Sequence, residues 1–389
     1  MRYKDCIVDY IRKNRGEKVN IIGAIDNIVD SYLDFVVQDN DLKLFDICMT
    51  PNLTQAQLDA FLAEFDIETV SAKKSVMLAY AMKNHPELDF GEHNGPRLKG
   101  LLNFQRFANL GLISHFTKIV RALNTVGIKP MIIKGGAMKH LRPELPRIMG
   151  DIDIVVASNR EYLQAIQIIT DLGYDYVDNE HAVDVHEKGK KKGLLDIHQF
   201  IELGVDYDHK FIAELFSRAQ LCKVFSCDVY VPSFEDLAFI SLMNMVKNLH
   251  DKTSMGGVIY TLIDYSWLKV NKSDFDFNRI VRDVEATDTS IQMMFAARFA
   301  NRLVKGMFDE ELASASNYTT QLENYFNREY FYQIYVHDIK YACKQIKLKS
   351  AFSGWNGFKT YVTNKIPHFF TKRIMKSQFL INLFLKFVH

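Results

Sequence analysis

Two aspartates separated by one residue are the most informative chemical feature of the sequence. Asp151 and Asp153 lie in an apolar stretch that runs on to Val156. Side chains alternate between the two faces of a β-strand, so a strand here points both carboxylates to one face. Carboxylate oxygens suit Mg²⁺, which typically takes one or two of them and completes its shell with water and substrate phosphates. The pair therefore indicates phosphoryl or nucleotidyl transfer.

The sequence before this pair distinguishes it from other Asp-x-Asp pairs. A short apolar run ends at Ile133 and is followed by Lys134, Gly135 and Gly136. The glycines allow the backbone to approach a ligand closely, and a helix that starts there aims free N–H groups at a phosphate. Lys134 adds a cation. Three further pairs lack such glycines and are interpreted as solvated carboxylates: Asp39/Asp41, Asp206/Asp208 and Asp274/Asp276.

A third carboxylate for such a site is expected at Asp196. It lies in the short apolar run Leu-Leu-Asp-Ile-His, which ends at His198 and is typical of a buried strand. A buried carboxylate must be paired or bound to a metal to offset its loss of hydration. The alternative is an ion pair with a basic neighbour from the 190–192 lysines. Together with the Asp151 pair, metal binding is favoured, and His198 shares the face of Asp196.

The elements that must position these residues follow from the apolar spacing. Helical spacing dominates before residue 126, for example at Phe104, Phe107 and Leu110. Ser233 is expected to cap the first helix after the sheet. Short apolar runs predict four strands, and helical spacing predicts one helix between them; the strands are Met131–Ile133, Ile152–Val156, Leu194–Ile197 and Val229–Val231, and the helix is Arg160–Leu172. The alternating segment from residue 180 to 186 is interpreted as an exposed strand rather than a metal site.

These patterns predict an α+β fold: a small mixed β-sheet core flanked by N-terminal and C-terminal helical regions. We expect a helical region (1–125), a catalytic core (126–233), a helical domain (234–338) and a basic amphipathic tail (339–389).

Composition excludes several classes of protein. With 389 residues, 48% of them hydrophobic and 24% charged, the chain resembles ordinary globular proteins. Its five cysteines are scattered and form no CxxC pair, which argues against a disulfide framework and structural zinc. Neither a signal peptide nor an apolar run of about 18 residues is present, so we expect a cytoplasmic protein.

The net charge of +1 conceals a basic tail. Residues 339–389 contain ten Lys or Arg and no Asp or Glu. The apolar residues of its last part fall near one helical stripe. Such a helix either docks on the protein's own core, which we favour, or lies peripherally on an anionic membrane.

Together, Lys134-Gly135-Gly136, Arg147, Asp151-x-Asp153 and Asp196-x-His198 resemble the pattern of an uncharacterised nucleotidyltransferase family within the DNA polymerase β-like superfamily. The pattern combines a Lys-Gly turn, an Arg shortly before a strand Asp-x-Asp, and a later strand with Asp-x-His. The resemblance spans roughly residues 105 to 270.

The resemblance implies a role for each residue. Asp151, Asp153 and Asp196 would be catalytic and would bind Mg²⁺, with Mn²⁺ as an alternative. The nucleoside triphosphate, ATP or another, would rest on Gly135 and Gly136. Lys134 and Arg147 would neutralise its phosphates. His198 would support the carboxylates without binding the metal. An NMP group would pass to an acceptor hydroxyl, and pyrophosphate would leave.

The acceptor is open, and near-neutral charge favours a small molecule, a sugar or a protein over nucleic acid. The main alternative is a catalytically inactive nucleotide-binding or scaffold protein, associated with a membrane surface through its tail.

Overall fold

The structure is a computed structural model that describes residues 21–143, 145, 147–178, 182–190, 193–199, 201, 210–249, 254–287 and 289–308. The basic tail lies outside these residues, and the two expectations for it stay predictions. The division into four regions also stays a prediction.

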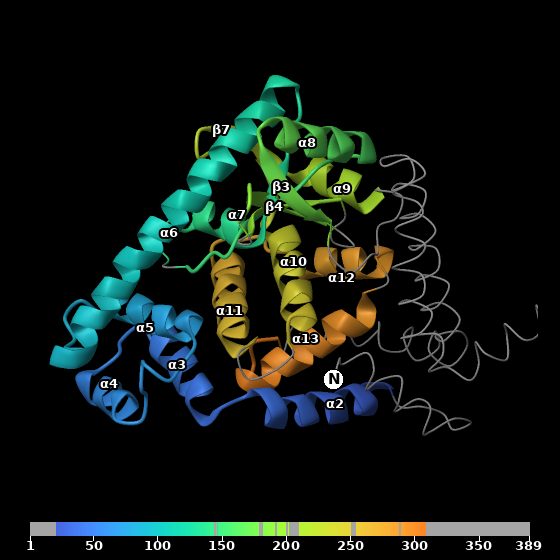
Figure 1. The fold of residues 1–389 in the computed structure, drawn as a ribbon. Helices are drawn as coiled ribbons and strands as arrows, with labels where there is room; N and C mark the ends of the chain where they lie inside the picture. The colour runs from blue at the N-terminus through green and yellow to red at the C-terminus, as the bar shows by residue number, and fades with distance from the viewer. Residues whose placement is uncertain are drawn as a thin grey trace, which may run out of the picture. The chain divides into compact units, whose positions relative to one another are not determined.

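Helices precede the sheet, as the apolar spacing predicts (Figure 1). They are α2 (Ile21–Val36), α3 (Asp39–Met49), α4 (Gln55–Leu62), α5 (Ala72–Asn84) and α6 (Gly91–Thr125). Helix α6 is 35 residues long and contains Pro96 in its second turn. It packs against α5 at one end and against the sheet at the other. A single helix thus connects the N-terminal helices to the sheet.

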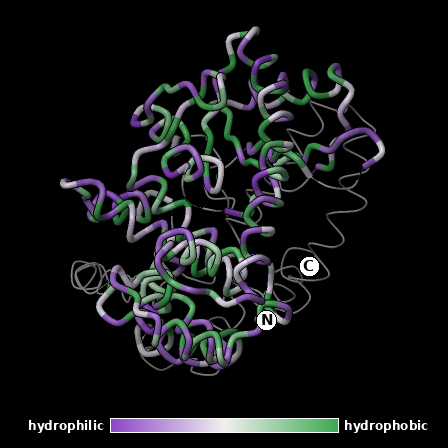
Figure 2. Tube along the Cα trace, turned by 90° about the vertical axis from the view of Figure 1, so that its left-hand side faces the viewer, coloured by the Kyte–Doolittle hydropathy of each residue, from purple (hydrophilic) through white to green (hydrophobic). Residues whose placement is uncertain are grey.

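Seven strands form one mixed sheet in the order β3-β4-β5-β2-β1-β7-β6. They are β1 (Met131–Ile133), β2 (Ile152–Val155), β3 (Tyr174–Asp178), β4 (Ala182–Glu187), β5 (Gly193–His198), β6 (Gln220–Val224) and β7 (Cys227–Val231). The pairs β2–β5 and β1–β7 are parallel, and the other neighbours are antiparallel. The central strands are mainly hydrophobic, as Figure 2 shows. The predicted α+β class and all four predicted strands are confirmed.

Three helices connect the strands: α7 (Lys134–Leu141), α8 (Asn159–Asp171) and α9 (Lys210–Arg218). Helix α8 matches the predicted helix to within one residue at each end. The alternating segment from residue 180 to 186 was expected to be an exposed strand; its described part does form a strand, but the expected exposure is wrong. Strand β4 pairs with β3 and β5, and Ala182, Val183, Val185 and His186 are buried.

The described C-terminal helices are α10 (Phe234–Lys247), α11 (Met255–Val270), α12 (Phe277–Ala286) and α13 (Ser290–Leu303). Ser233 caps α10 as predicted, because its hydroxyl accepts a hydrogen bond from the Asp236 backbone N–H. Helix α11 packs against α3 and α5, and α13 packs against α2. Helices from both sides of the sheet in sequence therefore share one core. Among the described helices, none is long and apolar enough to cross a membrane.

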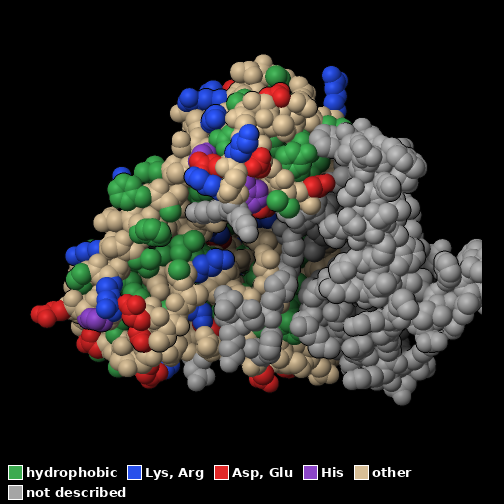
Figure 3. All heavy atoms as spheres, viewed as in Figure 1, with side chains coloured by type: hydrophobic (Ala, Val, Ile, Leu, Met, Phe, Trp, Pro, Cys, Tyr) green, Lys and Arg blue, Asp and Glu red, His purple; other side chains and the backbone are tan. Residues whose placement is uncertain are grey.

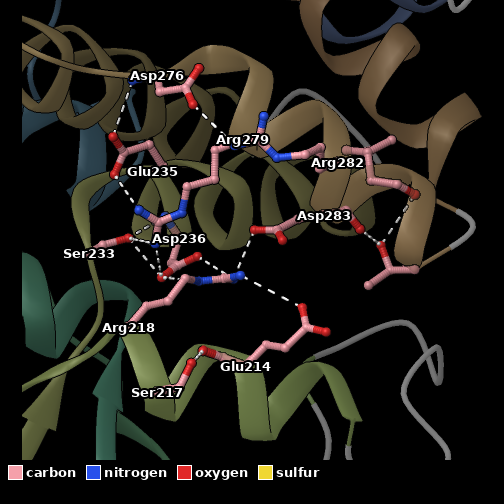
Figure 4. Close-up of polar contacts among 12 residues, drawn as sticks. Glu214, Ser217, Arg218, Ser233, Glu235, Asp236, Asp276, Arg279, Arg282 and Asp283 are labelled. Carbon is pink, nitrogen blue, oxygen red and sulfur yellow. Dashed lines mark hydrogen bonds and ion pairs between the residues drawn. The ribbon is translucent and has the colours of Figure 1, made fainter.

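A buried ion network joins the sheet region to these helices (Figure 4). The Asp236 carboxylate, at the start of α10, accepts hydrogen bonds from Arg218 at 2.7 Å and from Arg279 at 3.1 Å. Arg218 ends α9 and also pairs with Asp283 of α12 at 2.9 Å. Glu235 pairs with Lys272 and, at 3.6 Å, with Arg279. Since Asp236 and Glu235 are fully buried, their charges depend on these partners.

Candidate active site

Sheet register brings the aspartates of three strands into one row. Asp153 of β2 lies directly opposite Asp196 of the parallel strand β5. Asp196 in turn lies opposite Asp184 of the antiparallel strand β4. Side chains opposite one another share a face, so all three carboxylates project from the same side of the sheet. Ile152 and Ile154 alternate with Asp153 and face the other side, as predicted.

Asp153 is the most strongly held of these carboxylates. Its Oδ1 accepts hydrogen bonds from Lys134 Nζ at 2.9 Å and from His198 Nε2 at 3.0 Å. Burial opposes ionisation of Asp153, but Lys134 and His198 outweigh it and lower the pKa of Asp153 to about 2. An ionised carboxylate has no proton to donate, so His198 donates from Nε2. His198 thereby orients Asp153.

Asp196 and Asp151 experience the opposite effect. Burial, followed by the negative charges of Asp151, Asp153 and Asp184, raises the pKa of Asp196 to about 8. Burial and Asp153 likewise raise the pKa of Asp151 to about 6, against the effect of Lys134. Protein groups therefore supply too little positive charge for all of these carboxylates.

The donor set fits a divalent cation. One ligand atom each from Asp153, Asp196 and His198 lies within 4.8 Å of the others. Asp196 Oδ1 is buried and has no hydrogen-bond partner among the described residues. The alternative ion pair is absent at Lys190, which contacts Glu187 instead; Lys191 and Lys192 lie outside the described residues. Carboxylate oxygens and excess negative charge favour a hard cation such as Mg²⁺ or Mn²⁺. Asp151, which directly precedes β2, is not part of this group of three.

Lys134 forms the turn between β1 and α7. Its φ of +51° lies in the left-handed region, which residues other than glycine, asparagine and aspartate adopt at some energetic cost. This backbone conformation starts the helix directly at the end of the strand. Lys134 thus both forms the turn and places a cation on Asp153.

The two glycines after Lys134 have different surroundings. A Cβ on Gly136 would lie 2.9 to 3.0 Å from side-chain atoms of Ile132 and Ile152, so this glycine allows α7 to pack closely on the sheet. A Cβ on Gly135 would lie 3.4 Å from Arg147 Nε. Gly135 therefore faces the charged side of the turn.

Arg147 lies beside this turn and is held by helix α11. Its Nη1 donates to Asp264 Oδ2, and its guanidinium lies 5.1 Å from the centre of the Tyr260 ring. From α6, Asn109 donates to the Arg147 carbonyl at 2.8 Å. Burial raises the pKa of Asp264 despite the neighbouring Arg147. The turn, α6 and α11 thus meet at one arginine.

Comparison with known proteins agrees with this arrangement. A family model described as an uncharacterised nucleotidyltransferase matches residues 75–305, which is more than half of the chain. The chain belongs to this nucleotidyltransferase family. The match begins in α5, spans all seven strands and ends after α13.

Among solved structures, the chain is similar to the crystal structure of an antigenic nucleotidyltransferase-like protein from Paracoccidioides brasiliensis. The similarity covers 52% of this chain and 91% of that chain, with 14% sequence identity and a TM-score of 0.34. No curated protein matches the chain.

One carboxylate of the candidate site was not expected from the sequence. Asp184 lies opposite Asp196, and its charge contributes to the raised pKa values of Asp151 and Asp196. Its side chain lies over Gly193, where a Cβ would approach Asp184 Oδ1 to 2.4 Å. The alternation of polar and apolar residues around Asp184 already indicated a strand. Once that strand is placed next to the strand of Asp196, Asp184 joins the row of carboxylates.

We expect the two glycines after Lys134 to respond differently to alanine. Gly136→Ala forces α7 away from Ile132 and Ile152 and should reduce the free energy of unfolding by about 1–3 kcal/mol. Gly135→Ala meets only an ordinary contact and serves as the matched control, with a change below about 1 kcal/mol. Chemical denaturation of both variants measures the difference. Equal stability of the two variants would contradict the packing role of Gly136.

Proposed function

We propose that the chain is a polymerase β-like nucleotidyltransferase that moves an NMP group from a nucleoside triphosphate to an acceptor hydroxyl. The row of Asp153 and Asp196 beside the Lys134 turn carries this proposal. It combines ligands for a divalent cation with a cation and a glycine turn next to them. Phosphoryl transfer needs this combination, because the protein contributes mainly positioning and charge stabilisation.

In this proposal, Asp151, Asp153 and Asp196 hold Mg²⁺, or alternatively Mn²⁺. The cation, when bound, neutralises the triphosphate and makes the acceptor hydroxyl more acidic. His198 fixes the orientation of Asp153 through their hydrogen bond. Asp196 lies opposite Asp153, and its Oδ1 has no hydrogen-bond partner among the described residues. This free oxygen also suits the role of orienting the acceptor hydroxyl and taking its proton.

The triphosphate would bind beside this row, at the turn between β1 and α7. Gly135 and Gly136 offer backbone N–H groups from the first turn of α7, and Lys134 and Arg147 offer positive charge. As the acceptor oxygen bonds to the α-phosphorus, the bond from that phosphorus to the bridging oxygen breaks and pyrophosphate leaves. Lys134 and Arg147 stabilise the charge that develops on the leaving group.

We further propose that the acceptor is a small molecule, a sugar or a protein, and that the protein acts in the cytoplasm. The near-neutral net charge of +1 supports an acceptor other than nucleic acid, since dedicated nucleic-acid binders usually carry a strong basic patch.

Nucleotide binding with and without Mg²⁺ tests the proposal directly. We expect one or more of ATP, CTP, GTP and UTP at saturation to raise the melting temperature by about 5 °C in the presence of Mg²⁺. The double variant Asp151→Ala/Asp153→Ala should lose this shift. Asp175→Ala, which removes a carboxylate of β3 outside the row, is the matched control and should keep it. A folded protein that shows no shift with any nucleotide would favour the inactive scaffold instead.

A further inference from the structure

Helix α6 exposes hydrophobic side chains that no part of the proposed reaction uses. Phe104 and Phe107 are each 72% exposed, and Leu110 is 51% exposed. Figure 3 shows hydrophobic side chains gathered over the middle of α6, at the left of the view. The core-facing side of the same helix consists of other residues, including Leu98, Gln105, Asn109, Leu112 and Phe116. The exposed face is therefore a second face of α6.

The exposed face has the spacing of a coiled-coil seam. Gly100, Phe104, Phe107 and Gly111 are separated by four, three and four residues, and all four are exposed. Alternation of three and four residues keeps side chains in one line along a helix that faces another helix. A Cβ on either glycine would meet nothing within 4 Å, so both glycines leave open space. The seam therefore has two large rings at its centre and a gap on each side.

The seam is also symmetric about its midpoint. In an antiparallel pair of α6 helices centred between Gln105 and Arg106, residue n faces residue 211 − n of the other helix. Phe104 then faces Phe107 of the second copy, and Gly100 faces Gly111 of that copy. Each ring lies next to a glycine that gives it room. This self-complementarity is what a two-fold symmetric interface requires, because the same patch serves both copies.

Charge along α6 supports the same orientation. Glu92 is exposed near the beginning of the helix, whereas Lys118 and Arg121 are exposed near its end. Lys118 Nζ also lies 5.0 Å from the centre of the Tyr174 ring of its own chain. In the antiparallel pair, Glu92 comes within one helical turn of Lys118 and Arg121 of the other copy. A parallel pair would place Glu92 beside Glu92 and Lys118 beside Lys118. Glu92 is the one acidic residue among the six exposed charged residues of α6, and the antiparallel pair places it beside basic residues of the other copy.

We propose that the chain forms a symmetric dimer through antiparallel contact of the exposed faces of two α6 helices. The shared seam from His93 to Lys118 is roughly 40 Å long at 1.5 Å per residue. One pair of helices gives a contact at the lower end of the range for specific interfaces, so we expect dissociation at micromolar concentration.

The mass of the full chain in solution tests the dimer. Sedimentation of the wild type over a range of concentrations should approach twice the chain mass of 45.0 kDa. Phe104→Glu/Phe107→Glu should remain at 45.0 kDa with an unchanged melting temperature, because both side chains are largely exposed. Val270→Glu changes an 81% exposed side chain outside α6 and should dimerise like the wild type. A monomeric wild type at every concentration, or a dimeric double variant, overturns the proposal.

Cysteine cross-linking tests the register. Positions 97 and 114 face each other in the antiparallel pair, so a mixture of Arg97→Cys and Ser114→Cys proteins should form a disulfide-linked dimer on mild oxidation. Each variant alone, and the wild type with its own cysteines, should form at least tenfold less. Equal cross-linking in single and mixed samples would contradict the antiparallel register.

Discussion

Replacing Asp196 by asparagine is expected to reduce nucleotide transfer by about 10³-fold while the protein stays folded. Asp196 lies between Asp153 and Asp184 in the row, and its Oδ1 has no partner among the described residues. Asparagine keeps the shape of the side chain but removes its charge and its ability to take a proton. Transfer of label from an α-labelled nucleotide to acceptors in a cell extract measures the loss.

Stability distinguishes this effect from simple unfolding. Burial and the neighbouring carboxylates raise the pKa of Asp196 to about 8, so its carboxyl is mostly uncharged near pH 7 in the metal-free protein. An uncharged asparagine in its place should therefore melt no lower than the wild type. Mn²⁺ should raise the melting temperature of the variant less than that of the wild type. Asp175→Asn, in the same sheet but outside the row, should leave transfer and Mn²⁺ response unchanged. Transfer by Asp196→Asn within tenfold of the wild type would exclude the proposed role of Asp196.

Asp236→Ala is expected to cause the largest loss of stability. The fully buried Asp236 carboxylate binds Arg218, Arg279 and the Ser233 hydroxyl. Its removal leaves two largely buried guanidinium groups short of negative charge at the junction of α9, α10 and α12. Breaking a buried pair from one side typically costs about 3–5 kcal/mol, which corresponds to a fall in melting temperature of roughly 5 °C for a chain of this length.

An exposed ion pair provides the comparison. Asp30 of α2 contacts Arg302 of α13 at 3.1 Å, and Asp30 is more than half exposed. Asp30→Ala should change the free energy of unfolding by less than about 1 kcal/mol, since solvent screens such pairs. Thermal melts of both variants in one buffer measure the contrast. Similar losses for Asp30→Ala and Asp236→Ala would show that burial of the network contributes little.

The sequence is sufficient for the local part of the fold. Strands β1, β2, β5 and β7 are short apolar runs between turn residues, and these signals require no knowledge of the rest of the chain. Strands β3 and β6 are mostly polar or half-buried because they form the two edges of the sheet. An edge strand needs fewer apolar residues, so the apolar pattern of β3 and β6 is weak. Only their pairing with the neighbouring strands β4 and β7 identifies them.

The site residues that sequence analysis missed join the site through contacts with residues far away in the sequence. The Asp-x-Asp pair and Asp196 are recognisable because each lies in an apolar run. Asp184 joins them only through the β4–β5 register. Asp264, which holds Arg147, is 117 residues away in sequence. No spacing rule connects residues so far apart.

Helix α6 illustrates a different limit. Its apolar spacing at Phe104, Phe107 and Leu110 correctly predicts a helix, yet these residues are exposed. The buried face includes the polar residues Gln105 and Asn109, and Asn109 is needed to bind the Arg147 carbonyl. Apolar spacing therefore identified the helix but not the face that the core covers.

The pairing of Arg147 with Asp264 bears on how members of this family exchange parts during evolution. Since the arginine belongs to the loop between α7 and β2 and its buried counter-charge belongs to α11, the two must be inherited together. A recombinant that receives its strands from one relative and its later helices from another would inherit the pair only if both parents had it. Selection on this one contact would therefore link the two gene segments.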